Sequence, residues 1–360
     1  MCVTLPEIDS LSITLLVDNY TDRLLPSSLI AIRPPMMKNG RFLPPPPPVA
    51  EHGFSALIRV ASNDNMAYQN KGQSLNENII LFDCGTSENG VLSNAEILGI
   101  NFNSINSIIL SHGHFDHFTG LPGILKRIDK PIKLICHPDV FLRRWIIFPN
   151  GKDKARLPFL DKEELQRLGA VIMTKKDPSL ISQGSIEEYQ YRINDNTVVD
   201  NSIPKLLVTG WIPRTTTYEK GFPLQYKEDV NTSNLIPDPL VNDDQAIVVN
   251  IKNKGLIIIS GCAHAGIINT IKYAKSLTGI NKIYAVIGGF HLTGGGIYED
   301  AIEPTITELK KIDPRYLIPC HCTGWKATNR IIQELPEKFL QPSTCTVSYT
   351  HLTLPTILRV

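Results

Sequence analysis

Seven consecutive residues, Ser111–His117, read SHGHFDH and hold three of the nine histidines of the chain beside one aspartate. Imidazole and carboxylate groups are typical protein ligands of zinc and related divalent ions. His112 and His114 lie two positions apart, so an extended loop can point both at one ion, while Asp116 and His117 can face a second. The alternative is a polar loop in which Asp116 only accepts backbone hydrogen bonds. That alternative is unfavourable, because polar groups at the end of a buried strand need partners.

Other residues with the same chemistry also follow apolar, β-rich runs. Six of the nine histidines stand in such positions, and so do an aspartate and a thiol; beyond the SHGHFDH run these residues are Asp83, Cys262, His264, His291 and His321. Strand ends in a layered α/β fold can converge on one edge of a sheet. We therefore expect these side chains to meet the histidine run in one metal centre.

The elements that must position these residues alternate along the chain. Buried strands are predicted at 12–19, 54–60, 78–85, 106–114, 132–138, 245–261 as a hairpin, 282–291 and 316–324, and helices at 161–169, 266–277 and 301–312. Alternating strands and helices predict an α/β protein built from layers of helices and sheets.

We predict one domain over residues 1–346, interrupted by two irregular segments. A proline-rich loop is expected at 33–50, because five consecutive prolines cannot form a helix or a sheet ladder. A polar insertion is expected near 176–205. Residues 347–360 follow a plausible ending and resemble translated adapter sequence, so we expect a non-native tail and assign no role to His351.

Composition limits the classes of partner. The 360 residues carry a formal net charge of +1, which gives no electrostatic reason to expect nucleic acid or an acidic membrane as a partner. No apolar run approaches the roughly 18 residues of a membrane span, and the N-terminus lacks the regions of a signal peptide. Seven scattered cysteines are expected to be reduced thiols of a cytoplasmic protein. A small-molecule substrate is the expected partner, and the oligomeric state stays open.

The run SHGHFDHFTGL resembles the His-x-His-x-Asp-His signature of the metallo-β-lactamase superfamily. Together with ILFDCG, GCAHAGIINTIKYA, VIGGFHL and IPCHCTG, it is similar to the branch of 7,8-dihydropterin-6-methyl-4-(β-D-ribofuranosyl)aminobenzene-5′-phosphate synthase-like proteins. The resemblance covers residues 10–343. It implies an αββα sandwich and a metal-dependent enzyme of hydrolase or hydrolase-like transferase type, with one or two Zn²⁺ ions.

The resemblance also implies roles for single residues. His112 and His114 would bind a first metal, and Asp116, His117 and His321 a second, while Asp83 would orient the histidine loop from behind. Cys262 stands where many members place a bridging aspartate. It is either a ligand or a buried thiol, and His264 is the preferred third ligand of the first metal.

Several roles remain open at this stage. His291 could be a ligand, a catalytic acid or base, or a structural histidine, and Asp116 could also take part in catalysis. Cys320 and Cys322 are expected to pack on the face of their strand opposite His321. An anion pocket could form from Thr323 and Lys326, at the start of a helix, or from Arg214, unless Arg214 only pairs with Glu219. Hydrolysis of a phosphoester or lactone, and transfer of a pterin-methyl group with departure of diphosphate, are both compatible with such a site.

Overall fold

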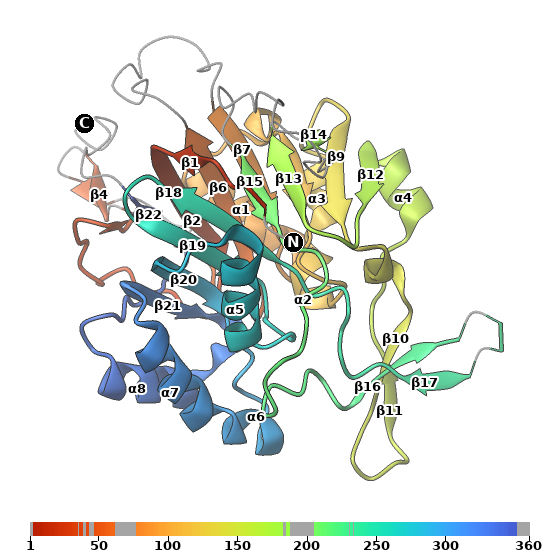
Figure 1. Cartoon of the computed structure of the whole chain (residues 1–360). Coiled ribbons are helices and arrows are strands. Elements are labelled where there is room, and N and C mark those ends of the chain that lie inside the picture. Colours follow the sequence, from red (N-terminus) through yellow and green to blue (C-terminus); the bar gives the residue numbers. More distant parts are fainter. Residues whose placement is uncertain are drawn as a thin grey trace, which may run out of the picture.

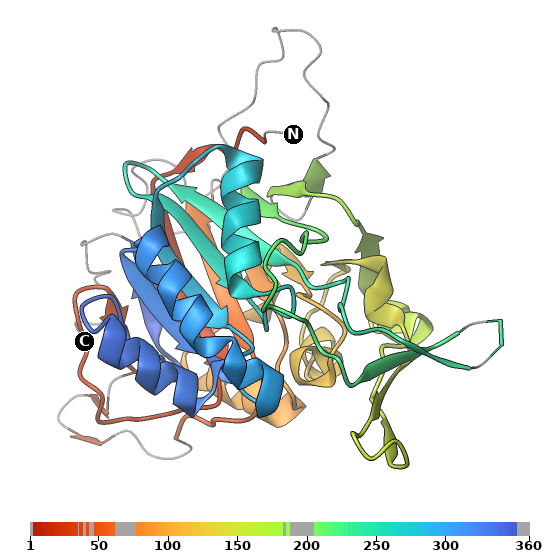
Figure 2. The same cartoon turned by 60° about the horizontal axis from the view of Figure 1, so that its bottom comes forward.

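The computed structural model describes residues 3–34, 36–38, 41–42, 47–61, 77–182, 185–187, 205–229, 231–232 and 234–350. Two mixed sheets lie face to face, with helices covering the outer face of each (Figures 1 and 2). The first sheet runs β14 (Ser185–Glu187), β13 (Ser179–Ser182), β15 (Leu206–Val208), β18 (Ala246–Ile251), β19 (Gly255–Ser260), β20 (Ile283–Gly289), β21 (Tyr316–Cys320), and β1 (Glu7–Ile8) pairs with β18.

The second sheet carries the histidine loop. Its order is β12 (Ala170–Thr174), β9 (Ile132–Cys136), β8 (Ser107–Ile109), β7 (Glu77–Phe82), β6 (Ser55–Ala61), β2 (Ser10–Val17), β22 (Val347–Tyr349), β3 (Ala31–Ile32). A four-stranded sheet projects from the sandwich in both views and runs β11 (Lys154–Arg156), β10 (Arg144–Ile147), β16 (Gln225–Glu228), β17 (Leu235–Pro237). β4 (Met37–Lys38) pairs antiparallel with β5 (Arg41–Phe42).

The helices divide between the two outer faces. The helices α5 (Ile267–Thr278), α6 (Gly296–Asp300), α7 (Ile302–Ile312) and α8 (Trp325–Glu334) follow strands of the first sheet. The helices α1 (Glu88–Ile97), α2 (Phe115–Phe118) and α3 (Leu121–Leu125) follow strands of the second sheet, and α4 (Lys162–Arg167) precedes β12 of that sheet. Short 3₁₀ turns occupy Phe102–Ser104, Pro138–Phe141 and His321–Thr323.

Three buried apolar clusters define the layers. One, containing Ile258 and Ile271, lies between the first sheet and its helices. A second, containing Ile58 and Ile259, lies between the two sheets, and the third packs the second sheet against its own helices. Three apolar interfaces separate four layers, so the predicted αββα sandwich is confirmed.

Helix α5 shows how local sequence sets a boundary next to the candidate centre. The chain enters it through Gly266, at a φ of +93° that favours glycine, and the Glu219 carboxylate accepts hydrogen bonds from the Ile268 and Asn269 amides. The helix ends at Gly279, which adopts the left-handed conformation typical of a C-cap. The turn at Gly266, two residues after His264, therefore sets where α5 begins.

The two predicted irregular segments contain some regular structure. β13 and β14 fall inside the predicted insertion, while residues 183–184 and 188–204 of it lie outside the described residues. The paired strands β4 and β5 fall inside the predicted proline-rich loop, of which residues 35, 39–40 and 43–46 are likewise not described. Among the described residues, no helix has the length and apolar character needed to cross a bilayer.

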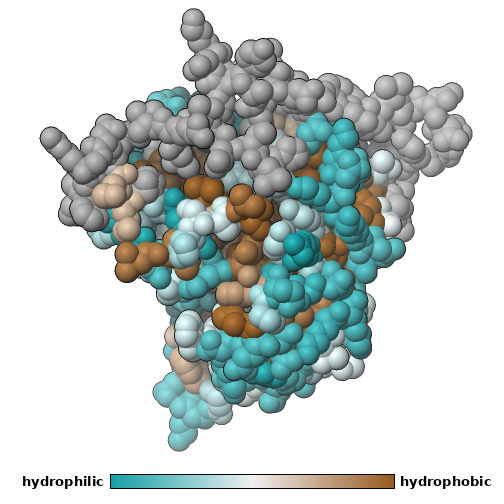
Figure 3. All heavy atoms as spheres, turned by 90° about the vertical axis from the view of Figure 1, so that its left-hand side faces the viewer, coloured by the Kyte–Doolittle hydropathy of each residue, from teal (hydrophilic) through white to brown (hydrophobic). Residues whose placement is uncertain are grey.

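The first residues of the predicted tail take part in the second sheet. β22 pairs with β2 on one side and β3 on the other, and the Thr350 hydroxyl accepts a hydrogen bond from the Leu11 amide. Hydrophobic residues gather on this face of the molecule (Figure 3), and Tyr349 lines an apolar pocket there with Leu11 and Tyr316. That residues 347–360 are foreign to the natural chain stays a prediction, and residues 351–360 lie outside the described residues.

Two truncated chains should show how much residues 347–350 and residues 351–360 each contribute to stability. A chain ending at residue 350 keeps β22, so we expect its urea unfolding curve and metal content to match those of the full chain. A chain ending at residue 346 loses β22, and we expect its free energy of unfolding to fall by about 1–3 kcal/mol, the sum of a few cross-strand pairs. Equal stability of the two truncated chains would contradict the expectation.

Candidate metal centre

The histidine loop begins where β8 ends and continues into the single turn of α2. His112 and His117 are fully buried and His114 nearly so. The ring centroid of His112 lies 4.5 Å from that of His114 and 4.3 Å from that of His117. Three imidazoles therefore lie in contact in a buried part of the fold, where polar rings without partners are unfavourable.

Asp83 lies behind this loop and is hydrogen-bonded to it. It follows β7 at a φ of +59° and is fully buried. Its carboxylate accepts hydrogen bonds from the amide and the hydroxyl of Ser111, each at 2.7 Å, and its Oδ2 lies 2.7 Å from His117 Nδ1. Because Nδ1 is engaged in this way, His117 presents Nε2 to the cluster.

A buried ion pair clamps the middle of the loop at Gly113. Asp243 Oδ2 accepts a hydrogen bond from the Gly113 amide at 2.7 Å, and Arg144 Nη1 donates one to the Gly113 carbonyl at 3.2 Å. Arg144 and Asp243 bind each other at 2.5 Å. A Cβ at position 113 would lie 2.4 Å from the Val140 carbonyl oxygen, so the clamp requires glycine. The sequence analysis missed Arg144 and Asp243, which carry no motif.

Gln225 of β16 is a second missed residue. It is fully buried, its Oε1 is hydrogen-bonded to His114 Nε2, and its amide nitrogen donates to Asp238 Oδ2 at 2.9 Å. The projecting four-stranded sheet thus orients His114 and leaves its Nδ1 for a ligand. No local pattern around residue 225 distinguishes this glutamine from one exposed to solvent.

Cys262 and His264 follow β19 and both reach the histidine loop. Cys262 Sγ lies 3.1 Å from His117 Nε2. The His264 ring centroid is 4.7 Å from that of His112 and 4.6 Å from that of His114. Ala263 between them has a φ of +54°, so the chain turns sharply here and the two side chains face the same centre.

His321 approaches from β21 and is held by the end of β2. Its amide donates a hydrogen bond to Asp18 Oδ1 at 2.7 Å, and its Nδ1 lies 3.1 Å from Asn19 Oδ1. Its Nε2 is then 3.1 Å from Asp116 Oδ2. A backbone φ of +45° at His321 turns the side chain out of the strand direction and towards Asp116.

Among the described residues, three sets of side chains bring their donor atoms within 4.8 Å of one another, and Cys262 belongs to all three. They are Asp116–His117–Cys262–His321, His112–Cys262–His264 and Cys262–His291–Cys322. His114 is in none of these sets, although its ring contacts His112 and His264.

Orphaned nitrogens indicate that the first two sets fit metal ions. His112 Nε2 and both ring nitrogens of His264 are buried and have no hydrogen-bond partner among the described residues. Burial lowers the pKa of His112 and of His264 well below the ordinary value, so both rings are neutral at pH 7 and their lone pairs are free. Neutral imidazoles, a carboxylate and a thiol are the donor set of a divalent transition-metal site.

The opposite pKa shifts of Asp116 and His117 show an ion pair inside the first of these sets. Burial alone would raise the pKa of Asp116, but the charges of His117 and His321 hold it well below its usual range. Burial would lower the pKa of His117, but Asp116 and Asp83 raise it to about 9. His117 is therefore protonated at pH 7 in the absence of metal, and a metal ion that binds its Nε2 must displace a proton.

The three residues predicted to bind an anion have other partners. The Thr323 hydroxyl is buried and accepts a hydrogen bond from the Phe290 amide at 3.1 Å. Lys326 is exposed and pairs with Glu299 at 2.5 Å. The Arg214 guanidinium donates to the backbone carbonyls of Ile212 and Leu240, rather than pairing with Glu219. Each of the three residues thus has a partner within the protein, although Arg214 Nε is buried without a hydrogen-bond partner among the described residues.

Cys322 corrects another expectation. Cys320 does pack away from the centre, in the cluster between the sheets. Cys322 instead joins the centre, because β21 ends at Cys320 and the following 3₁₀ turn breaks the alternation of a strand.

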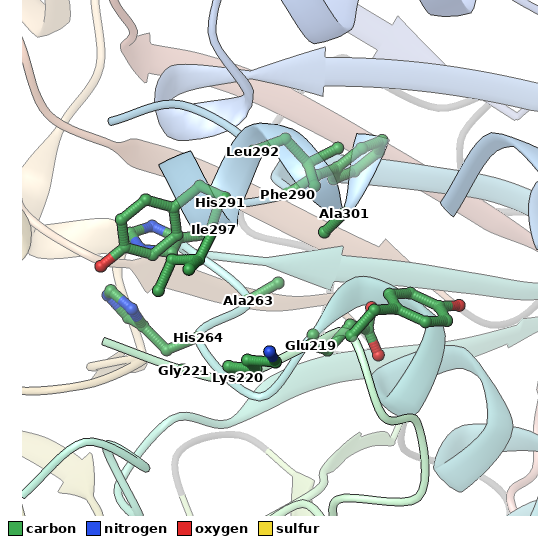
Figure 4. Close-up of a pocket in the computed structure, with 13 residues that line it drawn as sticks. Glu219, Lys220, Gly221, Ala263, His264, Phe290, His291, Leu292, Ile297 and Ala301 are labelled. Atoms are coloured by element: carbon green, nitrogen blue, oxygen red, sulfur yellow. The ribbon is translucent and has the colours of Figure 1, made fainter. Parts of the chain in front are cut away.

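A pocket opens beside His264 and His291 (Figure 4). Its lining includes Lys220, Phe290 and Tyr298, and the His291 ring lies 4.1 Å from that of His264 and 4.9 Å from that of Tyr298. Lys220 is exposed to solvent. The lining of the pocket thus brings His264 of the centre together with aromatic side chains and a cation.

Comparison with known proteins places this geometry in a family. Residues 75–173 match the model of the metallo-β-lactamase superfamily. The chain is 34% identical over 295 residues to 7,8-dihydropterin-6-methyl-4-(β-D-ribofuranosyl)-aminobenzene-5′-phosphate synthase of Methanocaldococcus jannaschii. The matched region covers 81% of this chain and 87% of that protein. An uncharacterized protein of the same organism is 30% identical over 284 residues, and this match covers 79% of this chain and 88% of that protein.

A solved structure agrees on the fold. The crystal structure of Tm1679, a metal-dependent hydrolase of the β-lactamase superfamily, superposes with a TM-score of 0.62 at 21% identity and covers 94% of this chain and 98% of that one. With the sandwich, the histidine loop and the extent of the sequence match, the chain belongs to the metallo-β-lactamase superfamily, in the family of the dihydropterin–aminobenzene phosphate synthase.

Proposed function

We propose that the protein is a zinc-dependent transferase that joins a dihydropterin-methyl diphosphate to an aminobenzene ribofuranosyl phosphate. The observation that carries the proposal is the buried donor set around Cys262, in a chain 34% identical to a synthase named for that product. The methylene carbon of the pterin would form a bond to the amino nitrogen. Its bond to the diphosphate oxygen would break, and the amine would lose a proton.

The residues of the centre suit a diphosphate leaving group. A divalent ion held by the His112 and Asp116 sets would supply Lewis-acid stabilisation of the charge that develops on the departing oxygen. Lys220, in the adjoining pocket, offers a cation to the outer phosphate. Asp116 stays ionised because His117 and His321 lower its pKa, so it serves as a ligand or hydrogen-bond acceptor and not as an acid.

The aromatic side of the pocket suits the flat pterin. Phe290 and Tyr298 line it. Phe222, which is not itself a lining residue, lies 5.9 Å from His291 and 6.3 Å from Tyr298, measured between ring centroids. Both His291 nitrogens lack a hydrogen-bond partner among the described residues. His291 can therefore bind the substrate, or take the proton that the amine loses.

Product analysis tests the proposal against hydrolysis by the same centre. Purified, zinc-loaded protein is incubated with both substrates in ¹⁸O-labelled water, and products are identified by mass spectrometry. We expect the coupled product and unlabelled diphosphate. A pterin alcohol carrying ¹⁸O, with no coupled product, would show that the protein is a hydrolase and not a transferase. No turnover of either substrate would overturn both the transferase and the hydrolase.

A further inference from the structure

Cys262, His291 and Cys322 lie together at the carboxyl ends of three neighbouring parallel strands. β19, β20 and β21 pair in parallel, with Ser260 opposite Gly288 and Gly289 opposite Cys320. The three side chains follow the carboxyl ends of these strands, and their donor atoms lie within 4.8 Å of one another. Parallel strands end on the same edge, so the fold itself builds this set.

The packing around the two thiols leaves space for this arrangement. Cys262 and Cys322 are both buried, and the Cys322 thiol donates a hydrogen bond to the Cys262 carbonyl at 3.4 Å. A Cβ at position 289 would lie 2.6 Å from Cys322 Sγ and 3.1 Å from Cys262 Cα. The glycine at this position is what allows Cys322 to lie beside Cys262.

The set has the composition and dimensions of a soft-metal site. Both His291 nitrogens are buried and without a hydrogen-bond partner among the described residues, and neither Cys322 nor His291 belongs to the other two ligand sets. Two ligands of a tetrahedral zinc ion lie about 3.6 Å apart for bonds of about 2.1–2.3 Å, so a small inward rotation suffices. Two thiolates and an imidazole favour Zn²⁺, Cd²⁺ or Cu⁺ over harder ions.

We propose that Cys262, His291 and Cys322 form a third metal position, rich in thiolate, beside the two positions served by the histidine loop. Cys262 is common to all three positions. An ion bound at the third position therefore draws the Cys262 thiolate towards Cys322 and away from His117. The position goes beyond the transferase reaction, and its test does not depend on turnover.

Cadmium binding to the reduced, metal-stripped full-length chain tests the proposal. Cd²⁺ is titrated while the sulfur-to-cadmium charge-transfer absorbance and the bound cadmium are measured. Cys322→Ser should lose about half of the absorbance, one thiolate of two, and should bind cadmium at this position at least about tenfold more weakly. His291→Ala should weaken binding while keeping the absorbance at saturation, which gives a second readout if Cys322→Ser folds poorly.

Cys320→Ser is the matched control. Cys320 is equally buried, two residues away, and its thiol donates to the Ile318 carbonyl instead of facing the centre. We expect it to bind cadmium as the unaltered chain does. Unchanged absorbance and affinity in Cys322→Ser would overturn the proposal, and so would an equal loss in Cys320→Ser, which would show a general effect of altering the core.

Discussion

Replacing His264 with alanine should remove one equivalent of bound metal per chain and slow formation of the coupled product by more than about 100-fold. The His264 ring lies against those of His112 and His114, and neither of its nitrogens has another partner among the described residues. A zinc ion at a catalytic site usually has three protein ligands, so the loss of one leaves too few. The effect should exceed the roughly 10- to 100-fold loss typical of a residue that only supports a ligand.

His137→Asn is the control for this substitution. His137 is also a buried histidine after a strand, but its Nδ1 accepts a hydrogen bond from the Asp139 amide, a role that an asparagine oxygen can keep. We expect metal content and turnover close to those of the unaltered chain. Metal analysis by mass spectrometry and the product assay decide the question. Full metal occupancy in His264→Ala would show that His264 is not a ligand.

The sequence allowed the layers and the histidine loop to be predicted because both depend on local pattern. Apolar runs mark strands, and the alternation of strands with helices such as α5 and α7 fixes the class of fold. The residues from His112 to His117 are close in sequence, so they must be close in space. His264 and His321 could be added because they follow strands, and strand ends meet at an edge.

The supporting contacts could not be predicted, because they depend on tertiary packing alone. Arg144, Asp243 and Gln225 look like surface residues in a chain with 36 basic and 35 acidic side chains, yet all three are buried. Cys322 was misplaced for a different reason. The prediction assumed that the strand continued through it, whereas a positive φ at His321 turns the chain after β21.

Arg144 gives the second large effect that we expect. Its guanidinium lies between Asp243 at 2.5 Å and Asp238 at 3.4 Å, and its side chain is only 1% exposed. Arg144→Leu would leave the buried Asp243 carboxylate without a cation, whereas Asp238 keeps Lys227 at 3.3 Å. The free energy of unfolding should therefore fall by about 3–5 kcal/mol. The Gly113 carbonyl would lose its donor as well. Metal affinity should therefore also fall, by about 10- to 100-fold. Urea unfolding and metal titration measure the two effects.

Arg143→Leu is the matched control, because Arg143 is the adjacent residue, has a half-exposed side chain and lies 3.8 Å from Glu228. A surface pair of this kind contributes about 0–1 kcal/mol.

The pH dependence of stability gives a further check on Arg144. Burial by itself would raise the pKa of Asp243. The charge of Arg144 nevertheless lowers that pKa in the folded chain below its ordinary value. The ion pair therefore stabilises the fold fully above pH ~4, and this contribution is lost as the pH falls through the lowered folded-state pKa. The stability gap between the unaltered chain and Arg144→Leu should accordingly narrow in acid. A gap that stays constant from pH 7 into that range, or an equal loss in Arg143→Leu, would show that Arg144 acts through packing and not through its charge.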